Sequence, residues 1–138
     1  MKRQQAITTI MTEAVVSVDV AQPLSDVYHA LKRARFHHIP VLDGNGPVGM
    51  ISSTDVLKLV YDVDGSSDRM LTTMLDHQFN IEDAMSTELV TLPDTATVHD
   101  AAELLAEGTL HSVLIVEPSG GLAGIVTSTD LVRYLRDL

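Results

Sequence analysis

Cysteine is absent from all 138 residues of the chain, which excludes disulfide bonds, thiolate catalysis and cysteine-ligated zinc sites. Aromatic residues make up only 4% of the sequence and tryptophan is missing, so aliphatic side chains must fill the core. No apolar run approaches the ~18–20 residues of a membrane-spanning helix, and residues 1–5 lack the apolar stretch of a signal peptide. We therefore expect a cytoplasmic protein with no membrane contact.

Positive charge is also scarce, because nine lysines and arginines stand against nineteen acidic residues and give a formal net charge of −10. A nucleic-acid binder needs clustered positive charge, so no nucleic-acid partner is expected. The candidate basic patch consists of Lys32, Arg33 and Arg35, followed by His37 and His38. This patch either attracts an anion locally or is a solvated helix end, where the helix dipole favours basic residues.

A seven-residue motif occurs twice, as Gly49–Asp55 and as Gly124–Asp130, and each copy has a glycine, two apolar residues, three hydroxyl residues and an aspartate. The apolar pair ends a predicted strand, one hydroxyl residue caps the following helix, and the aspartate lies in its first turn. Free N–H groups and hydroxyls at a helix N-terminus suit an anion such as phosphate, and the aspartate can accept hydrogen bonds from sugar hydroxyls. The simpler alternative is a helix cap that is used twice.

The repeated motif belongs to a duplication of the whole chain. Met11 aligns with Met85 at the start of the two copies, and Asp55 aligns with Asp130 near their ends once a single extra residue is allowed in the second copy. The extra residue falls in a turn, where an insertion is tolerated best.

Both halves show the same order of predicted elements: a short extended segment, a helix, two strands joined by a tight turn, and a second helix. The helices carry apolar residues at i, i+3, i+4 spacing, and the strands are nearly continuous apolar runs. Strands are predicted over 15–18, 39–42, 48–51, 89–92, 113–116 and 123–126, and the apolar helix positions are Leu24, Val27, Tyr28, Leu31, Ala34, Val56, Leu57, Val60, Tyr61, Val98, Ala101, Ala102, Leu105, Leu131, Val132 and Leu135.

The predicted domain organisation follows from the duplication. An N-terminal segment covers residues 1–10, the first repeat 11–62, a linker with a short helix 63–84, and the second repeat 85–138. Neither repeat, at roughly 55 residues, can bury much apolar surface alone, so the two repeats are expected to pack through their sheets. The predicted fold class is α/β (α+β), with two β-α-β-β-α repeats.

With these motifs the chain resembles a tandem pair of CBS domains, the regulatory module named after cystathionine β-synthase. Each repeat opens with Met-(Thr/Ser)-x-x-(Val/Leu)-Val and ends with the seven-residue motif, and the resemblance covers residues 7–138. It implies pseudo-twofold packing of the sheets, with two clefts between the repeats. It also implies adenosine-containing regulatory ligands (AMP, ADP, ATP or S-adenosylmethionine), no obligatory cofactor, and a disc-like homodimer. We expect a stand-alone pair without a catalytic domain.

The same resemblance assigns the residues of two ligand sites. The aspartates Asp55 and Asp130 would bind ribose, and the opening segment of the opposite repeat would contact adenine. The phosphate-side hydroxyls would be Ser52, Thr54, Thr127 and Thr129; Met50, Ile125, Thr12, Val16, Ser86 and Val90 would line the ligand; and His37, His38 and His111 would face the phosphates.

In the family, an arginine often precedes the middle strand of each repeat. This sequence departs from that pattern and has His38 and Ser112 at these positions. Neutral histidine and serine attract phosphate less than a fixed positive charge does. This departure argues against tight triphosphate binding, especially at Asp130. We therefore rank the Asp55 site, with its histidines and Arg35, above the Asp130 site for anionic ligands.

Other chemistries fit the sequence less well. The six histidines form no zinc-protease pattern, and the adjacent His37 and His38 would point to opposite faces of a strand, so no metal is expected. No nucleophile elbow or phosphate-binding loop is present, and no general base accompanies the repeated hydroxyls. The chain is not expected to be an enzyme.

Two functions of different classes remain open. In the first, a ligand in the clefts changes the relative arrangement of the repeats, and an effector protein that the sequence does not identify reads this change. In the second, the pair is a ligand-independent platform for dimerisation or docking.

Overall fold

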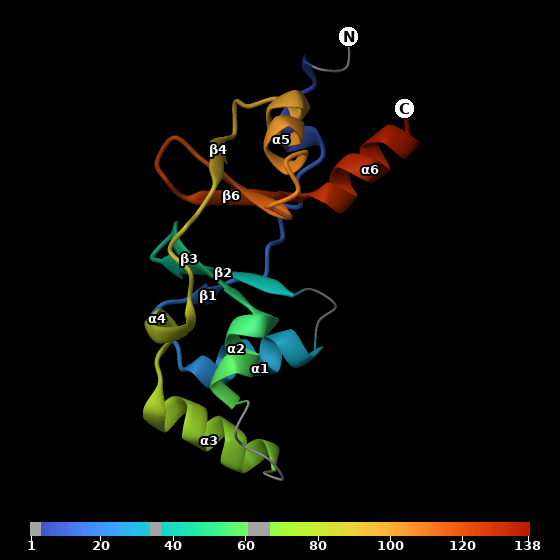
Figure 1. The fold of residues 1–138 in the computed structure, drawn as a ribbon. Helices are drawn as coiled ribbons and strands as arrows, with labels where there is room; N and C mark the ends of the chain where they lie inside the picture. The colour runs from blue at the N-terminus through green and yellow to red at the C-terminus, as the bar shows by residue number, and fades with distance from the viewer. Residues whose placement is uncertain (1–3, 34–36, 61–66) are drawn as a thin grey trace. The chain divides into compact units, whose positions relative to one another are not determined.

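The computed structural model describes residues 4–33, 37–60 and 67–138 of the chain (Figure 1). These residues form two compact units. Unit 1 comprises Met1–Val15 and Leu89–Leu138, and unit 2 comprises Val16–Glu88. The unit boundaries therefore do not coincide with the ends of the repeats.

Unit 2 contains a three-stranded sheet in the order β1-β2-β3. Strand β1 (Val18–Asp19) pairs in parallel with β2 (His38–Asp43), which pairs antiparallel with β3 (Gly46–Ser52). A parallel pair needs a crossover connection, and helix α1 (Leu24–Arg33) provides it. Helix α2 (Ser53–Val60) follows β3 directly. The first repeat is thus β-α-β-β-α, as predicted.

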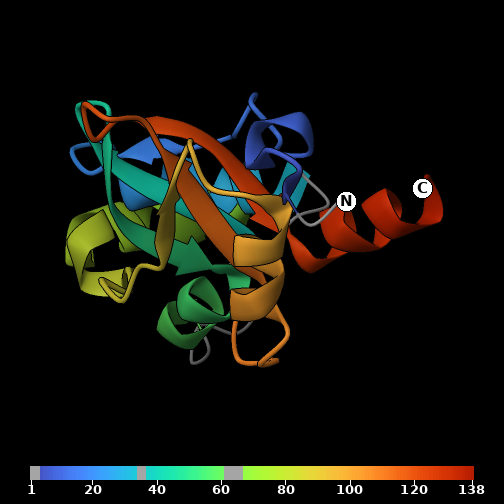
Figure 2. The same ribbon diagram turned by 90° about the horizontal axis from the view of Figure 1, so that it is seen from above.

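Unit 1 repeats this arrangement with β4 (Thr91–Pro93), α5 (Val98–Leu105), β5 (Ser112–Val116), β6 (Leu122–Thr127) and α6 (Ser128–Arg136). Strands β4 and β5 are parallel, and β5 and β6 are antiparallel. In Figures 1 and 2, α6 continues from the end of β6 and projects beyond the sheet of its own unit. The two sheets and the repeated element order confirm the predicted fold class.

The duplication extends to fine detail of the two hairpins. The pairing of β2 with β3 shifts register between Val41 and Leu42, and that of β5 with β6 shifts between Ile115 and Val116. These positions correspond to each other when Met11 is aligned with Met85. The two hairpins therefore share the same irregularity of strand pairing as well as the same element order.

The opening strands begin later than the sequence predicts. Residues 15–17 and 89–90 lie outside any strand, and pairing starts at Val18 and at Thr91. The remaining predicted strands lie within β2, β3, β5 and β6. Two residues of the predicted apolar helix faces, Ala34 and Tyr61, lie outside the described residues.

The segment between the two repeats contains two helices. Helix α3 (Asp68–Gln78) is longer than the predicted short helix, and its N-terminus is capped by the Ser67 side chain. Helix α4 (Ile81–Ala84) begins with a capping box of Asn80 and Asp83. The side chains of Leu75 and Ile81 are fully buried in the core of unit 2. This part of the chain therefore contributes to the core.

The N-terminal segment also joins a core, which the sequence did not predict. A 3-10 helix (η2, Ile7–Thr9) buries Ile7 completely, among the core residues of unit 1. The Ile7 N–H donates to Ala96 O at 2.9 Å, and the Val98 N–H donates to Gln5 O at 2.8 Å. Residues ahead of the first repeat therefore complete the unit that holds the second repeat.

Candidate ligand-binding sites

In unit 2, Ser52 and Asp55 form a reciprocal hydrogen-bonded pair at the start of α2. The Ser52 N–H donates to Asp55 Oδ2 at 2.9 Å, and the Asp55 N–H donates to Ser52 Oγ at 3.1 Å. Among the described residues, Asp55 Oδ1 has no hydrogen-bond partner. One carboxylate oxygen thus closes the cap, while the other can accept a hydrogen bond from a ligand.

In unit 1, Thr127 and Asp130 form the same capping box at the start of α6. The Thr127 N–H donates to Asp130 Oδ2 at 2.8 Å, the Thr127 hydroxyl contacts the same oxygen at 3.1 Å, and the Asp130 N–H donates to Thr127 Oγ1 at 3.3 Å. The Asp130 side chain is only 11% exposed. The repeated motif therefore caps a helix in both units.

A capping box alone does not indicate a ligand site, because α5 has an equivalent one. The Thr97 N–H donates to Asp100 Oδ2 at 2.9 Å, and the Asp100 N–H donates to Thr97 Oγ1 at 3.2 Å. Hydrogen bonds from Thr97 hold the pKa of Asp100 below its usual range. Unlike Asp55 and Asp130, which are half-buried, this aspartate is exposed, so the Asp100 box serves as an internal comparison for the other two.

In each of the two repeated motifs, the strand that leads into the capping box pairs with the opening segment of the other repeat. The Met50 and Ser86 backbones exchange hydrogen bonds of 2.9 and 2.8 Å in unit 2. The Ile125 and Thr12 backbones exchange hydrogen bonds of 2.9 and 3.0 Å in unit 1. The opening segment of each repeat therefore pairs with the strand that leads into the other repeat's capping box.

The first turns of α2 and α6 present further polar groups. Thr54 and Thr129 are exposed, and neither their hydroxyls nor their backbone N–H groups have a hydrogen-bond partner among the described residues. Together with the positive end of the helix dipole, such groups favour an anion. Two of the four predicted phosphate-side residues, Thr54 and Thr129, are thus accessible.

The histidines lie next to the same helix ends. His37 O accepts from the Ser53 N–H at 2.8 Å, and His111 O accepts from the Ser128 N–H at 3.3 Å. Both histidines are exposed, as is His38 at the start of β2. The predicted cation Arg35 lies outside the described residues.

Two predicted ligand-lining residues belong to a different unit from their assigned aspartates, so their assignment stays a prediction. Val16 belongs to unit 2 and Val90 to unit 1, whereas Asp130 and Asp55 belong to units 1 and 2. Val90 O accepts from the Leu114 N–H at 3.2 Å, inside the β4–β5 region.

The paired motifs and the exchanged opening segments agree with what sequence comparison finds. The family model described as CBS domain matches residues 7–62 and 81–137. The chain belongs to the CBS domain family. The chain is also 27% identical to the uncharacterized protein MJ1404 of Methanocaldococcus jannaschii over 96% of its own length, although it spans only 32% of that protein.

Solved CBS structures share the fold of the chain. A structure of CBSX2 in complex with AMP has a TM-score of 0.77 and 24% identity, over 96% of this chain and 97% of that one. The CBS domain pair of protein MJ0100, in complex with 5-methylthioadenosine and S-adenosyl-L-methionine, has a TM-score of 0.73 and 20% identity, over 95% of this chain and 99% of that one.

The two CBS repeats differ in the charge beside the aspartate. Arg133 Nη1 lies 3.8 Å from Asp130 Oδ1, one turn along α6. Lys58 occupies the corresponding position on α2, and among the described residues it forms no ion pair with Asp55. The i, i+3 spacing of Asp130 and Arg133 could have revealed this contact in the sequence. Asp130 therefore has an ion-pair partner on its own helix, whereas Asp55 has none among the described residues.

Two negative findings apply to the described part of the chain. No three histidine or acidic side chains gather there in a group that could hold a metal ion. No described helix combines the length and apolar character that crossing a membrane requires.

Proposed function

We propose that this CBS pair is a regulatory module that binds an adenosine-containing ligand at Asp55 and at Asp130. Related structures with AMP and with S-adenosyl-L-methionine support this ligand class. The observation that carries the proposal is the half-engaged Asp55 carboxylate, whose Oδ1 has no partner among the described residues. This oxygen would accept the ribose hydroxyls.

The other predicted site residues would contact the remaining parts of the ligand. The free N–H groups and hydroxyls of Thr54 and Thr129 would face the phosphate or the charged tail, and Ser52 and Thr127 would hold each aspartate in place. Met50, Ile125, Thr12 and Ser86 would contact the adenine, since their paired backbones form one edge beside each motif. His37, His38 and His111 would approach the phosphates. Val16 and Val90 remain assigned to the adenine by the family pattern.

The proposal also ranks the two sites. Asp130 is partly neutralised by Arg133, whereas Asp55 has both an unengaged oxygen and two neighbouring histidines. We expect the Asp55 site to bind AMP more tightly. Because His38 and Ser112 stand where the family often has an arginine, ATP should not bind much more tightly than AMP.

The regulatory role completes the proposal. A homodimer and an effector protein would convert ligand binding into a signal, and catalysis is not part of the function. The competing function is a ligand-independent dimerisation or docking platform. It shares the fold but predicts no effect of adenosine compounds at all.

A thermal-shift and calorimetric titration with AMP, ATP and S-adenosylmethionine separates the two functions. A ligand at about 100 times its Kd adds about 2.7 kcal/mol to the free energy of unfolding, and therefore raises Tm by several degrees. The test variants are Asp55→Asn and Asp130→Asn, which keep an oxygen to close the cap but remove an acceptor for ribose. Each should remove one binding site, while Asp100→Asn, in the matched capping box of α5, should leave both sites intact.

Two results would count against the sensor function. The first is the absence of saturable binding of any adenosine compound below millimolar concentration to the unmodified chain. The second is equal binding by the unmodified chain and by Asp55→Asn, which would remove the assigned role of the carboxylate.

A further inference from the structure

The part of unit 1 that carries Asp130 has little positive charge with which to hold an anionic ligand. Residues 89–138 contain seven aspartates and glutamates, no lysine, and two arginines, Arg133 and Arg136. Arg136 is engaged away from the site, since its Nε and Nη2 donate to the Asp137 carboxylate at 2.9 and 3.2 Å. Of the two arginines, Arg133 is therefore the one that is available to a ligand at Asp130.

The strand beside the capping box supplies no fixed cation. Ser112 lies directly opposite Thr127 in the ladder of β5 and β6, and Thr127 is the residue that caps α6. Ser112 also stands where the family often has an arginine. Neither Ser112 nor its neighbour His111 carries the permanent positive charge of a guanidinium. Among residues 89–138, a fixed cation for the Asp130 site must therefore come from α6.

Arg133 extends along the first turns of α6. Its Nη1 lies 3.8 Å from Asp130 Oδ1. A long side chain on a helix points back toward the N-terminus and lies over the turn that precedes its own Cα. At that end of α6, the Thr129 N–H and hydroxyl have no hydrogen-bond partner among the described residues. The Arg133 side chain is therefore directed toward the end of the helix that presents the predicted phosphate contacts.

The ion pair between Arg133 and Asp130 is weak enough for a ligand to replace. The Arg133 side chain is 63% exposed, and 3.8 Å is longer than a hydrogen bond. An exposed ion pair contributes little to stability, because solvent screens it and a long side chain must be ordered to form it. A phosphate offers the guanidinium two parallel hydrogen bonds instead. If Arg133 moves to a phosphate, Asp130 Oδ1 becomes free to accept from ribose.

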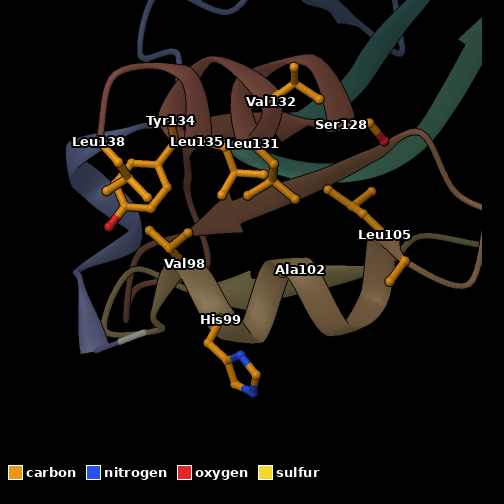
Figure 3. A pocket seen from close by; sticks show the side chains of 11 residues that line it. Val98, His99, Ala102, Leu105, Ser128, Leu131, Val132, Tyr134, Leu135 and Leu138 are labelled. Carbon is orange, nitrogen blue, oxygen red and sulfur yellow. The ribbon is translucent and has the colours of Figure 1, made fainter. Parts of the chain in front are cut away.

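The polar side of α6 is separate from its apolar side. Figure 3 shows Leu131 and Leu135 directed toward α5, where they line an apolar groove. Neither Asp130 nor Arg133 is among the residues that line this groove. With 3.6 residues per turn, these two residues lie on the other side of the helix. A substitution at Arg133 therefore leaves the apolar side of α6 unchanged.

The matching position in unit 2 is different. Lys58 corresponds to Arg133, and among the described residues it forms no ion pair with Asp55. A lysine ammonium is a point charge that cannot form the paired hydrogen bonds of a guanidinium. The two sites therefore present different cations to the tail of a bound nucleoside.

We infer that Arg133 selects the ligand tail at the Asp130 site. With a phosphate tail, Arg133 leaves Asp130, binds the phosphate and frees Oδ1 for the ribose. With an uncharged or sulfonium tail, Arg133 stays on Asp130 and competes with the ribose. The site thus takes a nucleoside phosphate in preference to a neutral or cationic nucleoside. Because the ion pair must first be given up, AMP still binds less tightly here than at Asp55.

The inference rests on the proposed adenosine-binding function and assigns the ligand class of one of its two sites. Calorimetric titration of the full chain carrying Asp55→Asn isolates the Asp130 site. AMP is compared with 5-methylthioadenosine, which has the same nucleoside and an uncharged tail. Adding Arg133→Gln should raise the Kd of AMP at least about fivefold, because the paired hydrogen bonds to phosphate are lost. The same change should lower the Kd of 5-methylthioadenosine by about twofold, because Asp130 no longer has a competing partner.

Two further variants control for charge and for structure. Arg136→Gln removes the same charge from the same last turn of α6, and both Kd values should stay unchanged. Arg133→Lys keeps the charge without the paired hydrogen bonds and should restore part of the AMP affinity. Opposite changes for the two ligands cannot arise from loss of the fold.

The outcomes separate this inference from the function on which it rests. An unchanged or lower Kd of AMP in Arg133→Gln would show that Arg133 only screens Asp130, and would overturn the inference while adenosine binding stands. If the chain with Asp55→Asn binds neither compound, the Asp130 site itself is wrongly assigned, and the inference falls with it.

Discussion

At Gly49 and Gly124 the strands β3 and β6 run so close to the opening segments that no side chain fits. A Cβ at Gly49 would lie 2.4 Å from Met85 Sδ and 3.1 Å from Ser86 O. A Cβ at Gly124 would lie 2.7 Å from Met11 Sδ and 2.8 Å from the Thr12 carbonyl oxygen. The glycine of each repeated motif is therefore required by the pairing of the opening segment with the strand that leads into the capping box.

We predict that Gly49→Ala and Gly124→Ala each lower the free energy of unfolding by about 1–3 kcal/mol, because the strand and the opening segment must move apart. The two variants should differ in how much stability a second substitution restores. At Gly49 the closest atoms belong to the flexible Met85 side chain, whereas at Gly124 a backbone oxygen is as close as the sulfur.

Adding Met85→Ala should therefore recover part of the loss in Gly49→Ala, measured as non-additivity in a urea-unfolding double-mutant cycle. Adding Met11→Ala to Gly124→Ala should recover little. Equal rescue at both positions would contradict the role of the Thr12 carbonyl.

At the scale of single helices, capping decides where α2, α5 and α6 begin. Each starts at a serine or threonine whose side-chain oxygen accepts a backbone N–H three residues on, and each has an aspartate that closes the box in return. The α2 and α6 boxes adjoin an opening segment, whereas the α5 box adjoins the N-terminal segment through the pairing of Thr97 with Ala6. The same local device thus serves as a stabilising cap in α5 and as the base of a candidate site in α2 and α6.

The α5 cap gives a pH-dependent prediction. Hydrogen bonds from the Thr97 backbone and side chain lower the pKa of Asp100 below its ordinary value of 3.8, so the carboxylate stabilises the folded state above that pH. This contribution is lost as the pH falls through the lowered pKa. The difference in stability between the unmodified chain and Asp100→Asn should therefore be largest at neutral pH and should shrink below pH 3.8. Urea unfolding at several pH values measures it, and a difference that grows on acidification would contradict the assignment.

At the scale of the whole molecule, the segment that opens each repeat belongs to the unit that holds the other repeat. Ile7 and Ile81 occupy equivalent positions, four residues ahead of Met11 and Met85, and both are fully buried, one in unit 1 and the other in unit 2. In both cases, the residues that precede one repeat in the sequence complete the core of the unit that holds the other repeat. A single repeat, cut out along its sequence boundaries, would therefore lack part of its own core.

Ile7→Ala tests this arrangement. Removal of a fully buried isoleucine side chain should lower the free energy of unfolding by about 2–5 kcal/mol. Amide hydrogen exchange should show the loss of protection in residues 89–138 and not in residues 16–60. The control Thr8→Ala changes an exposed residue of the same 3-10 helix and should have little effect. Loss of protection confined to residues 16–60 would contradict the exchange of segments.

The sequence by itself determined the repeated β-α-β-β-α order, the hairpins and the capping aspartates. These follow from local periodicity and from side chains that bond to their own backbone a few residues away. Only the tertiary structure decided that Ile7 completes the core of unit 1, that Thr12 pairs with Ile125, and that α3 covers α1 and α2. Such contacts join residues far apart in the chain, where many apolar partners are equally suitable, so packing and backbone pairing select among them.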